Sequence, residues 1–144
     1  MNVAIAPATP ADLPEILSLL ERAKLPRAGV GEHLADFIVA REGIRLVGCA
    51  GLERYGASGL LRSVAVEVAM RGLGLGQQLT QVLLTRARQI PLAHVYLLTE
   101  IAQAFFPRFG FRPIARTAVD AAVRESIEFT SACPDTAVAM ALEL

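Results

Sequence analysis

The stretch from Val64 to Gln77 constrains the fold of this chain more than any other feature. An apolar run rich in β-branched residues leads into Arg71, and glycines alternate at positions 72, 74 and 76 before an amphipathic segment. Glycine lets backbone N–H groups turn toward a ligand without interference from a Cβ atom. A helix behind it adds unpaired N–H donors and the positive end of its dipole. The stretch therefore predicts a strand, a turn that binds a phosphate or diphosphate, and a helix.

The spacing of these glycines excludes two common nucleotide-binding motifs. The dinucleotide fingerprint needs a glycine at its sixth position, where Gln77 or Leu79 stands here. A P-loop ends in Gly-Lys-Ser or Gly-Lys-Thr, whereas Gly76 is followed by two glutamines. What remains is Arg-x-x-Gly-x-Gly from Arg71 to Gly76, which resembles the acyl-coenzyme-A diphosphate motif of the GCN5-related N-acetyltransferases (GNAT family). The alternative is a glycine-rich turn that binds no ligand.

A second motif strengthens this resemblance. The segment Ala102-x-x-x-Phe106-x-x-x-Gly110-Phe111 resembles the later GNAT pattern A-x-x-x-Y-x-x-x-G-F, with Phe where the family often has Tyr. Three further segments, 61–63, 96–99 and 128–138, resemble the GNAT branch that is often encoded beside bacterial arsenic-resistance genes. The resemblance extends over nearly the whole chain and predicts a single acetyltransferase domain over residues 1–144.

Composition narrows the class of partners. The chain has 144 residues, 53% of them hydrophobic, and 14 basic residues balance 14 acidic ones, so no overall basic field favours nucleic acid. No apolar run approaches the roughly 20 residues that span a bilayer, and no signal peptide is recognised. Cys49 and Cys133 do not have the spacing of a metal or redox motif, which fits reduced thiols. We therefore expect a cytoplasmic protein with no metal and no membrane partner. Positive mean hydropathy at zero net charge favours a homodimer.

Apolar periodicity and turn residues predict the order β-α-β-β-β-α-β-α-β-α-β. The predicted strands cover residues 3–5, 36–40, 44–53, 60–68, 95–98, a strand after 109–113, and 136–144. The predicted helices cover residues 10–24, 75–90, 100–108 and 120–129, with a short helical turn at 31–34. The fold class is α/β (α+β). It has a GNAT-like mixed, mostly antiparallel sheet, one splayed parallel strand pair and helices on both faces.

The resemblance implies acetyl-CoA as cosubstrate and assigns its contacts. Backbone groups of Val64 and Val66, with Ala65 between them, face the pantetheine arm, and the amides from Arg71 to Gln77 hold the diphosphate. The implied cofactor-binding residues are Val64, Ala65, Val66, Arg71, Gly72, Leu73, Gly74, Leu75, Gly76, Gln77, Thr99, Phe105 and Phe106. Thr99 stands where many members have Asn.

Acetyl transfer needs a neutral amine, a polarised carbonyl and a stabilised thiolate. The family often protonates the thiolate with the Tyr that is Phe106 here, so the usual acid is absent. A water, Ser63 or Tyr96 are the open alternatives, and positioning alone contributes about 7–11 kcal/mol. Glu53, near the end of a strand beside the expected cleft, is the first candidate base, and Glu100 is the second.

Three residues are candidates for binding the acceptor. Arg62 has the geometry to bind a carboxylate through two hydrogen bonds, although a salt bridge to a neighbouring strand is equally compatible with the sequence. His33 follows the first helix, where such enzymes line the acceptor side; the alternative is an exposed polar residue on a connection. Tyr55 is expected to shape the pocket. The leading hypothesis is an acetyl-CoA-dependent N-acetyltransferase for a small, amino-acid-like amine. The alternatives are a non-catalytic acyl-CoA sensor and a purely structural dimeric domain.

Overall fold

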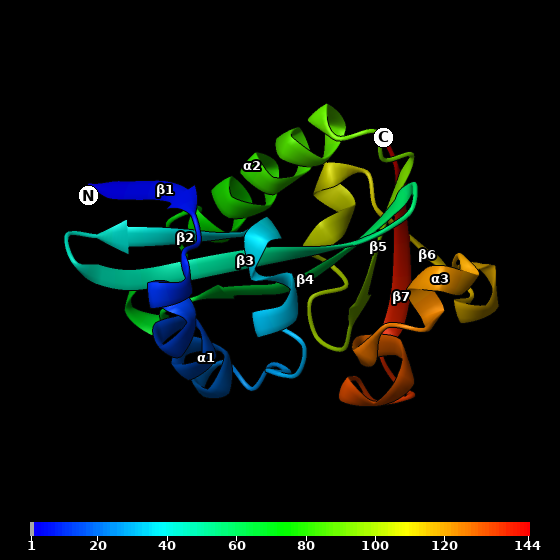
Figure 1. The fold of residues 1–144 in the computed structure, drawn as a ribbon, viewed down its shortest axis with the longest axis horizontal. Helices are drawn as coiled ribbons and strands as arrows, with labels where there is room; N and C mark the ends of the chain where they lie inside the picture. The colour runs from blue at the N-terminus through cyan, green and yellow to red at the C-terminus, as the bar shows by residue number, and fades with distance from the viewer. Residues whose placement is uncertain (1) are drawn as a thin grey trace.

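The computed structural model describes residues 2–144, which form a seven-stranded sheet covered by helices on both faces (Figure 1). The strands are β1 (Val3–Pro7), β2 (Phe37–Glu42), β3 (Arg45–Tyr55), β4 (Ser58–Val66), β5 (His94–Thr99), β6 (Arg112–Ile114) and β7 (Val138–Glu143). The α-helices are α1 (Leu13–Arg22), α2 (Leu75–Gln89) and α3 (Ala121–Arg124). The short 3₁₀ segments are η1 (Pro10–Asp12), η2 (Gly31–Asp36), η3 (Val68–Met70), η4 (Phe106–Phe109) and η5 (Arg116–Ala118), and η6 (Glu128–Ala132) is a π-helical turn.

The sheet has the order β1-β2-β3-β4-β5-β7-β6, and one pair of neighbours runs parallel. That pair is β4 and β5, which are joined through α2 by the crossover that a parallel pair requires. Their pairing stops at Leu60 and Tyr96, although β4 continues to Val66 and β5 to Thr99. The strands therefore diverge toward their carboxyl ends. The predicted sheet with one splayed parallel pair is confirmed.

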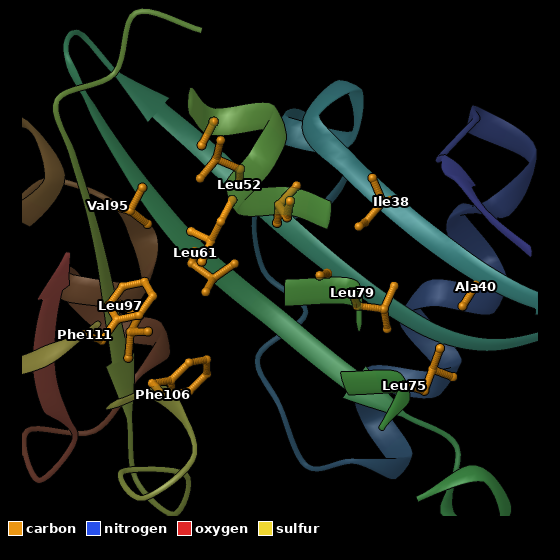
Figure 2. Close-up of a cluster of buried hydrophobic side chains, with 14 of the residues drawn as sticks. Ile38, Ala40, Leu52, Leu61, Leu75, Leu79, Val95, Leu97, Phe106 and Phe111 are labelled. Carbon is orange, nitrogen blue, oxygen red and sulfur yellow. The ribbon is translucent and has the colours of Figure 1, made fainter. Parts of the chain in front are cut away.

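One face of the sheet packs against α2. Leu75, Leu79 and Leu83 lie on the inner side of α2 and contact sheet residues such as Leu52 and Leu61. Figure 2 shows this cluster and its extension to Phe106 and Phe111 beside β5. The core on this face is therefore built mainly from leucines on a helix with a regular apolar stripe.

The opposite face is covered in two parts. Helix α1 buries Ile16, Leu19 and Leu20 against Phe37 and neighbouring residues of the sheet. Farther along the same face, α3 and the segment before it pack against β4, β5 and β7. A cluster of charged side chains lies between these two apolar clusters, and it forms part of the candidate site.

Three predicted helices differ from the structure. Residues 100–108 form a turn followed by η4 instead of a helix, because Pro107 has no N–H for an α-helical bond and clashes with the preceding turn. The predicted helix over 120–129 is divided into α3 and η6, and the break turns Glu128 into the protein. The first helix ends at Arg22, two residues early, because Lys24 has the left-handed conformation with φ 59°.

Candidate functional site

The predicted phosphate-binding turn lies between β4 and α2. Gly72 and Gly74 have φ values of 81° and 83°, a conformation that strains residues with a Cβ atom. Gly74 is also the residue that precedes α2, so the first N–H groups of that helix face the same opening as the turn. The alternating glycines are therefore explained by backbone conformation at positions 72 and 74.

The N–H groups of this turn are available to a ligand. Within residues 2–144, those from Gly72 to Gln77 donate to no protein acceptor. The N–H of Arg71 does have an acceptor, since it lies 3.2 Å from the carbonyl oxygen of Val68. The prediction that the amides from Arg71 onward bind the diphosphate is corrected by one residue: the series of free donors begins at Gly72.

A pocket of about 440 Å³ lies over these N–H groups. Its lining residues are Val66, Met70, Arg71, Gly72, Gly74, Leu75, Gly76, Gln77, Phe105 and Arg108. Nε of Arg71 donates to the carbonyl of Val66 at 3.0 Å, which holds this cation at the wall. The Arg108 guanidinium lies 4.7 Å from the centre of the Phe105 ring and supplies a second positive charge. The pocket combines amide donors with two cations, the chemistry that binds a diphosphate.

The predicted cofactor residues do not all point their side chains into this pocket. Leu73 is exposed, whereas Leu75 contributes backbone here and buries its side chain in the core. Ala65 faces α1 on the other side of the sheet. Phe105 forms part of the pocket wall, but the Phe106 ring packs against Phe111 inside the core (Figure 2).

The backbone of β4 is distorted where the two parallel strands diverge. Ser63 and Val64 together stand opposite Ala50 of β3, which is a β-bulge, and Ser63 has φ 60°. A non-glycine residue in this conformation is uncommon and is found more often at functional sites. Val64 lies in the bulge and Val66 follows it, and both are on the part of β4 that no longer pairs with β5. Their predicted role toward pantetheine is compatible with this position.

Thr99 and Glu100 lie at the end of β5. The Thr99 hydroxyl oxygen accepts a hydrogen bond from the Ala102 N–H at 3.0 Å and so caps the turn that follows. Glu100 is exposed, and the side-chain contacts found within residues 2–144 include no ion pair for it. Thr99 therefore has a structural task, and Glu100 is a solvated carboxylate in this structure.

Glu53 and Arg62 form a completely buried ion pair between β3 and β4. Arg62 Nη1 donates to Glu53 Oε2 at 2.8 Å, and neither side chain is exposed. The same guanidinium donates to the carbonyl oxygens of Pro26 and Ala28 at 3.1 and 2.7 Å, and to Ser63 Oγ at 3.0 Å. Arg62 thus follows the salt-bridge alternative, because its donors are used inside the protein instead of facing an acceptor carboxylate.

Tyr55 and His33 connect the buried Glu53 to the surface. The Tyr55 hydroxyl donates a hydrogen bond to Glu53 Oε1, and His33 Nε2 lies 3.7 Å from the same oxygen. Burial and the adjacent carboxylate raise the pKa of Tyr55, so this hydroxyl keeps its proton. His33 is 28% exposed. One carboxylate oxygen is therefore held by Arg62, and the other faces the more accessible His33 and Tyr55.

Glu128 is a member of this cluster that the sequence analysis did not single out. Its Oε2 lies 3.4 Å from Arg62 Nε, and its side chain is 5% exposed. Burial, with a contribution from Glu53, raises its pKa to about 7, against the opposing effect of Arg62. Burial raises the pKa of the neighbouring Cys133 thiol to about 12. The sequence placed Glu128 only at the start of the segment 128–138 that resembles a GNAT branch and gave it no role, because its position depends on the break between α3 and η6.

Within residues 2–144, no group of three or more potential metal-ligating side chains is present. No helix among these residues combines the length and the apolar character needed to cross a bilayer.

The fold and the pocket together define a class: a mixed sheet whose one parallel pair diverges beside a turn with free N–H groups and two cations. Residues 33–113 match the model of the acetyltransferase (GNAT) domain, more than half of the chain. The chain therefore belongs to the GNAT acetyltransferases, as the two sequence motifs predicted.

Individual relatives agree with this assignment. An amino-acid acetyltransferase of Mycobacterium tuberculosis is 40% identical over 80 residues, which are 55% of this chain and 45% of the relative. The match thus spans less than half of that curated relative. The crystal structure of Rv2747 from M. tuberculosis, in complex with CoA and NLQ, has a TM-score of 0.83 at 28% identity over 98% of this chain and 99% of that chain.

A more distant structure shares the fold alone. It is N-acetylglutamate synthase from Neisseria gonorrhoeae, complexed with coenzyme A and N-acetyl-glutamate. Its TM-score is 0.84 at 21% identity, over 100% of this chain and 35% of that one.

Proposed function

We propose that this chain is an acetyl-CoA-dependent N-acetyltransferase that modifies the primary amine of a small, amino-acid-like molecule. The observation that carries the proposal is the pocket whose floor is the unpaired N–H groups from Gly72 to Gln77, flanked by Arg71 and Arg108. These groups fit the diphosphate of coenzyme A. Residues 1–144 act as one acetyltransferase domain in this proposal.

Glu53 is the proposed base. Its Oε1 faces Tyr55 and His33 and is the oxygen not held by Arg62. Because Glu53 is buried, it accepts the ammonium proton through a water or through a rearrangement on the His33 side. His33 and Tyr55 line the approach to this carboxylate, which supports their assignment to the acceptor side.

Ser63 is the proposed proton donor for the leaving thiolate. Its oxygen already accepts a hydrogen bond from Arg62 Nε, so the hydroxyl proton is directed elsewhere. Ser63 also lies in the bulge beside the diverging strands. Phe106 has no proton to give, and its ring is part of the core.

The acceptor class is supported by two relatives. One is named an amino-acid acetyltransferase, and the other was crystallised with CoA and a second ligand. The resemblance to the arsenic-linked branch places amino-acid antimetabolites first among the acceptors to be tested.

The test combines calorimetry with a thiol-release assay. Acetyl-CoA should bind with a measurable heat, and pantetheine, which lacks the diphosphate, should bind much more weakly. Thiol release should then require an amine from a panel of amino acids and amino-acid mimics. Equal affinity for pantetheine and acetyl-CoA, or no heat with either, would contradict the proposal.

The second candidate is a non-catalytic acyl-CoA sensor, which the absence of a hydroxyl at Phe106 favours. A sensor binds acetyl-CoA and releases no thiol with any amine of the panel. The same two assays therefore separate an enzyme from a sensor, and both from a structural domain that binds no coenzyme A.

We also propose a cytoplasmic homodimer. Both cysteines are free thiols, as expected in a reducing compartment, and Ile44 and Ile101 are almost fully exposed. Sedimentation velocity decides the oligomeric state, and fractionation of the source cells decides the location.

A further inference from the structure

Arg62 is shared unequally by two buried carboxylates from different parts of the fold. Glu53 comes from β3 and receives a hydrogen bond of 2.8 Å from Nη1. Glu128 comes from η6 and lies 3.4 Å from Nε, a longer contact. Arg62 also holds the connection after α1 through the carbonyls of Pro26 and Ala28. One guanidinium therefore joins the sheet, the connection on the acceptor side and the C-terminal turn.

The charges in this cluster do not balance when both acids are ionised. Two carboxylates and one guanidinium carry a net charge of −1, and burial makes such an excess costly. A proton bound by one acid removes the excess. Glu53 has the shorter contact with Arg62 and a hydrogen bond from Tyr55, so Glu128 is the weaker partner. The pKa of Glu128, raised to about 7, agrees with this order.

We propose that Glu128 is a positioning residue for the reaction: through the Arg62 that both acids share, its charge sets how tightly the guanidinium holds the carboxylate of Glu53. The proposal rests on the proposed function, in which Glu53 is the base. When Glu128 is neutral, Arg62 binds Glu53 alone and holds its carboxylate in the ion pair. When Glu128 ionises, a second negative charge competes for Arg62, and the Glu53 carboxylate is held less tightly and is freer to turn toward the amine.

Titratable and charged side chains from three elements surround Glu128. Arg62 on β4, and Glu53 and Tyr55 on β3, face it from the sheet, and Cys133 follows it on its own segment. His33 on η2 lies beyond Glu53. Among these groups Arg62 is the permanent cation, so the ionisation of Glu128 changes the share of its charge that Glu53 receives.

The first experiment compares Glu128→Gln with Glu125→Gln, an exposed control directly after α3. We expect thiol release by the wild type to rise with pH through the region near 7, with the same acceptor and saturating acetyl-CoA. In Glu128→Gln this rise of the rate with pH should disappear, and the rate at pH 8 should fall several-fold. Glu125→Gln should keep the pH profile of the wild type. A rise that persists unchanged in Glu128→Gln overturns the proposal.

The second experiment needs no acceptor. The carboxyl carbons of Glu53 and Glu128 are followed by ¹³C NMR as the pH is raised in the wild-type protein. We expect the Glu53 resonance to respond to the titration of Glu128, and Glu128 to titrate well above 4.5. Independent titrations, or a Glu128 that is fully ionised at pH 5, overturn the proposal. This result stands even where Glu128→Gln fails to fold.

Stability gives a third measurement with a defined sign. Because folding raises the pKa of Glu128 from 4.5 to about 7, the folded state binds this proton more tightly than the unfolded state. The stabilisation is fully present below pH 4.5 and is lost as the pH rises toward 7. In Glu128→Gln the denaturation midpoint should depend less on pH across this range.

If no amine of the panel releases thiol, the proposed function fails, and the NMR and stability measurements still decide the coupling of the two acids.

Discussion

The two halves of the candidate site are built from different materials. The cofactor half is an open pocket whose donors are main-chain N–H groups between Gly72 and Gln77. The half that we propose for the acceptor, called the acceptor half below, is a buried network of charged side chains centred on Arg62. Main-chain recognition depends on backbone conformation, and it persists when exposed side chains such as Leu73 change. A buried ion network depends on each member, because removing one leaves another charge without a partner.

The variant with the largest expected effect tests whether the acceptor half acts in turnover and the cofactor half in binding. Glu53→Gln should lower turnover by about 10²–10⁴-fold, the usual contribution of a general base. Acetyl-CoA affinity, measured by calorimetry, should stay at the wild-type value because Glu53 does not line the cofactor pocket.

Glu100→Gln is the control for this prediction, since Glu100 is the exposed second candidate at the end of β5. Its turnover should match that of the wild type. A large loss in Glu100→Gln with little loss in Glu53→Gln would move the base to the other strand.

Removing the shared cation should show how strongly the acceptor half depends on its members. Arg62→Met leaves two buried carboxylates without a counter-charge and should lower the free energy of unfolding by about 3–5 kcal/mol at neutral pH. Urea denaturation measures the loss.

Arg54→Met is the matched control, because Arg54 lies on β3 and pairs with Asp36 at 2.6 Å with its side chain 47% exposed. An exposed pair contributes about 0–1 kcal/mol. Equal losses in the two variants would mean that the buried network adds nothing beyond a surface ion pair.

The cofactor half should respond to backbone conformation instead. Gly74→Val adds a β-branched side chain at φ 83° and should weaken acetyl-CoA binding at least tenfold, about 1.4 kcal/mol, because the turn that presents the N–H groups must change.

Gly43→Val separates this effect from strain in general. Gly43 has φ 61° in the β2–β3 turn, and a Cβ atom added at either glycine would meet no neighbouring atom within 4 Å. Both variants should lose similar stability by thermal denaturation, and Gly43→Val should bind acetyl-CoA like the wild type. Unchanged affinity in Gly74→Val would show that the turn does not hold the diphosphate.

The same contrast explains what the sequence could predict. The strand, the turn and α2 follow from local patterns: β-branched residues, glycines that allow positive φ, and an apolar stripe. The order of the central strands followed from the crossover between β4 and β5. The cofactor half was predictable because its donors belong to the backbone and stand next to one another in the sequence.

The acceptor half was not predictable from local patterns. Arg62 had two compatible roles in the sequence, and only the fold shows that Nη1 donates to Glu53 and that Glu128 lies 3.4 Å from Nε. Glu128 stands 66 positions after Arg62, and the predicted helix over 120–129 gave no reason to turn it inward. Long-range ion pairs of this kind depend on how separate elements pack.

Phe105 and Phe106 show that the sequence also did not predict which of two adjacent side chains faces the pocket. Both were predicted at the cofactor, but adjacent side chains on a turn point in different directions, and Pro107 prevents the helix that was expected there. The result is that Phe105 lines the pocket and Phe106 packs against Phe111. The family motif predicted the position of the turn and not which ring faces the ligand.

Phe106→Tyr tests this last assignment and has the smallest expected effect. The new hydroxyl would restore the residue type that the family often uses as its acid, but in this structure it would enter the core beside Leu97 and Phe111 (Figure 2). A buried hydroxyl without a partner costs about 1–3 kcal/mol, so the free energy of unfolding should fall by that amount while turnover does not rise. Phe105→Tyr is the control, because its ring lies at the pocket wall and a hydroxyl there reaches water; its stability should stay unchanged. A faster Phe106→Tyr enzyme would show that the ring turns from the core toward the cofactor during the reaction. Residue 106 would then belong to the cofactor half, although the fold places its ring in the core.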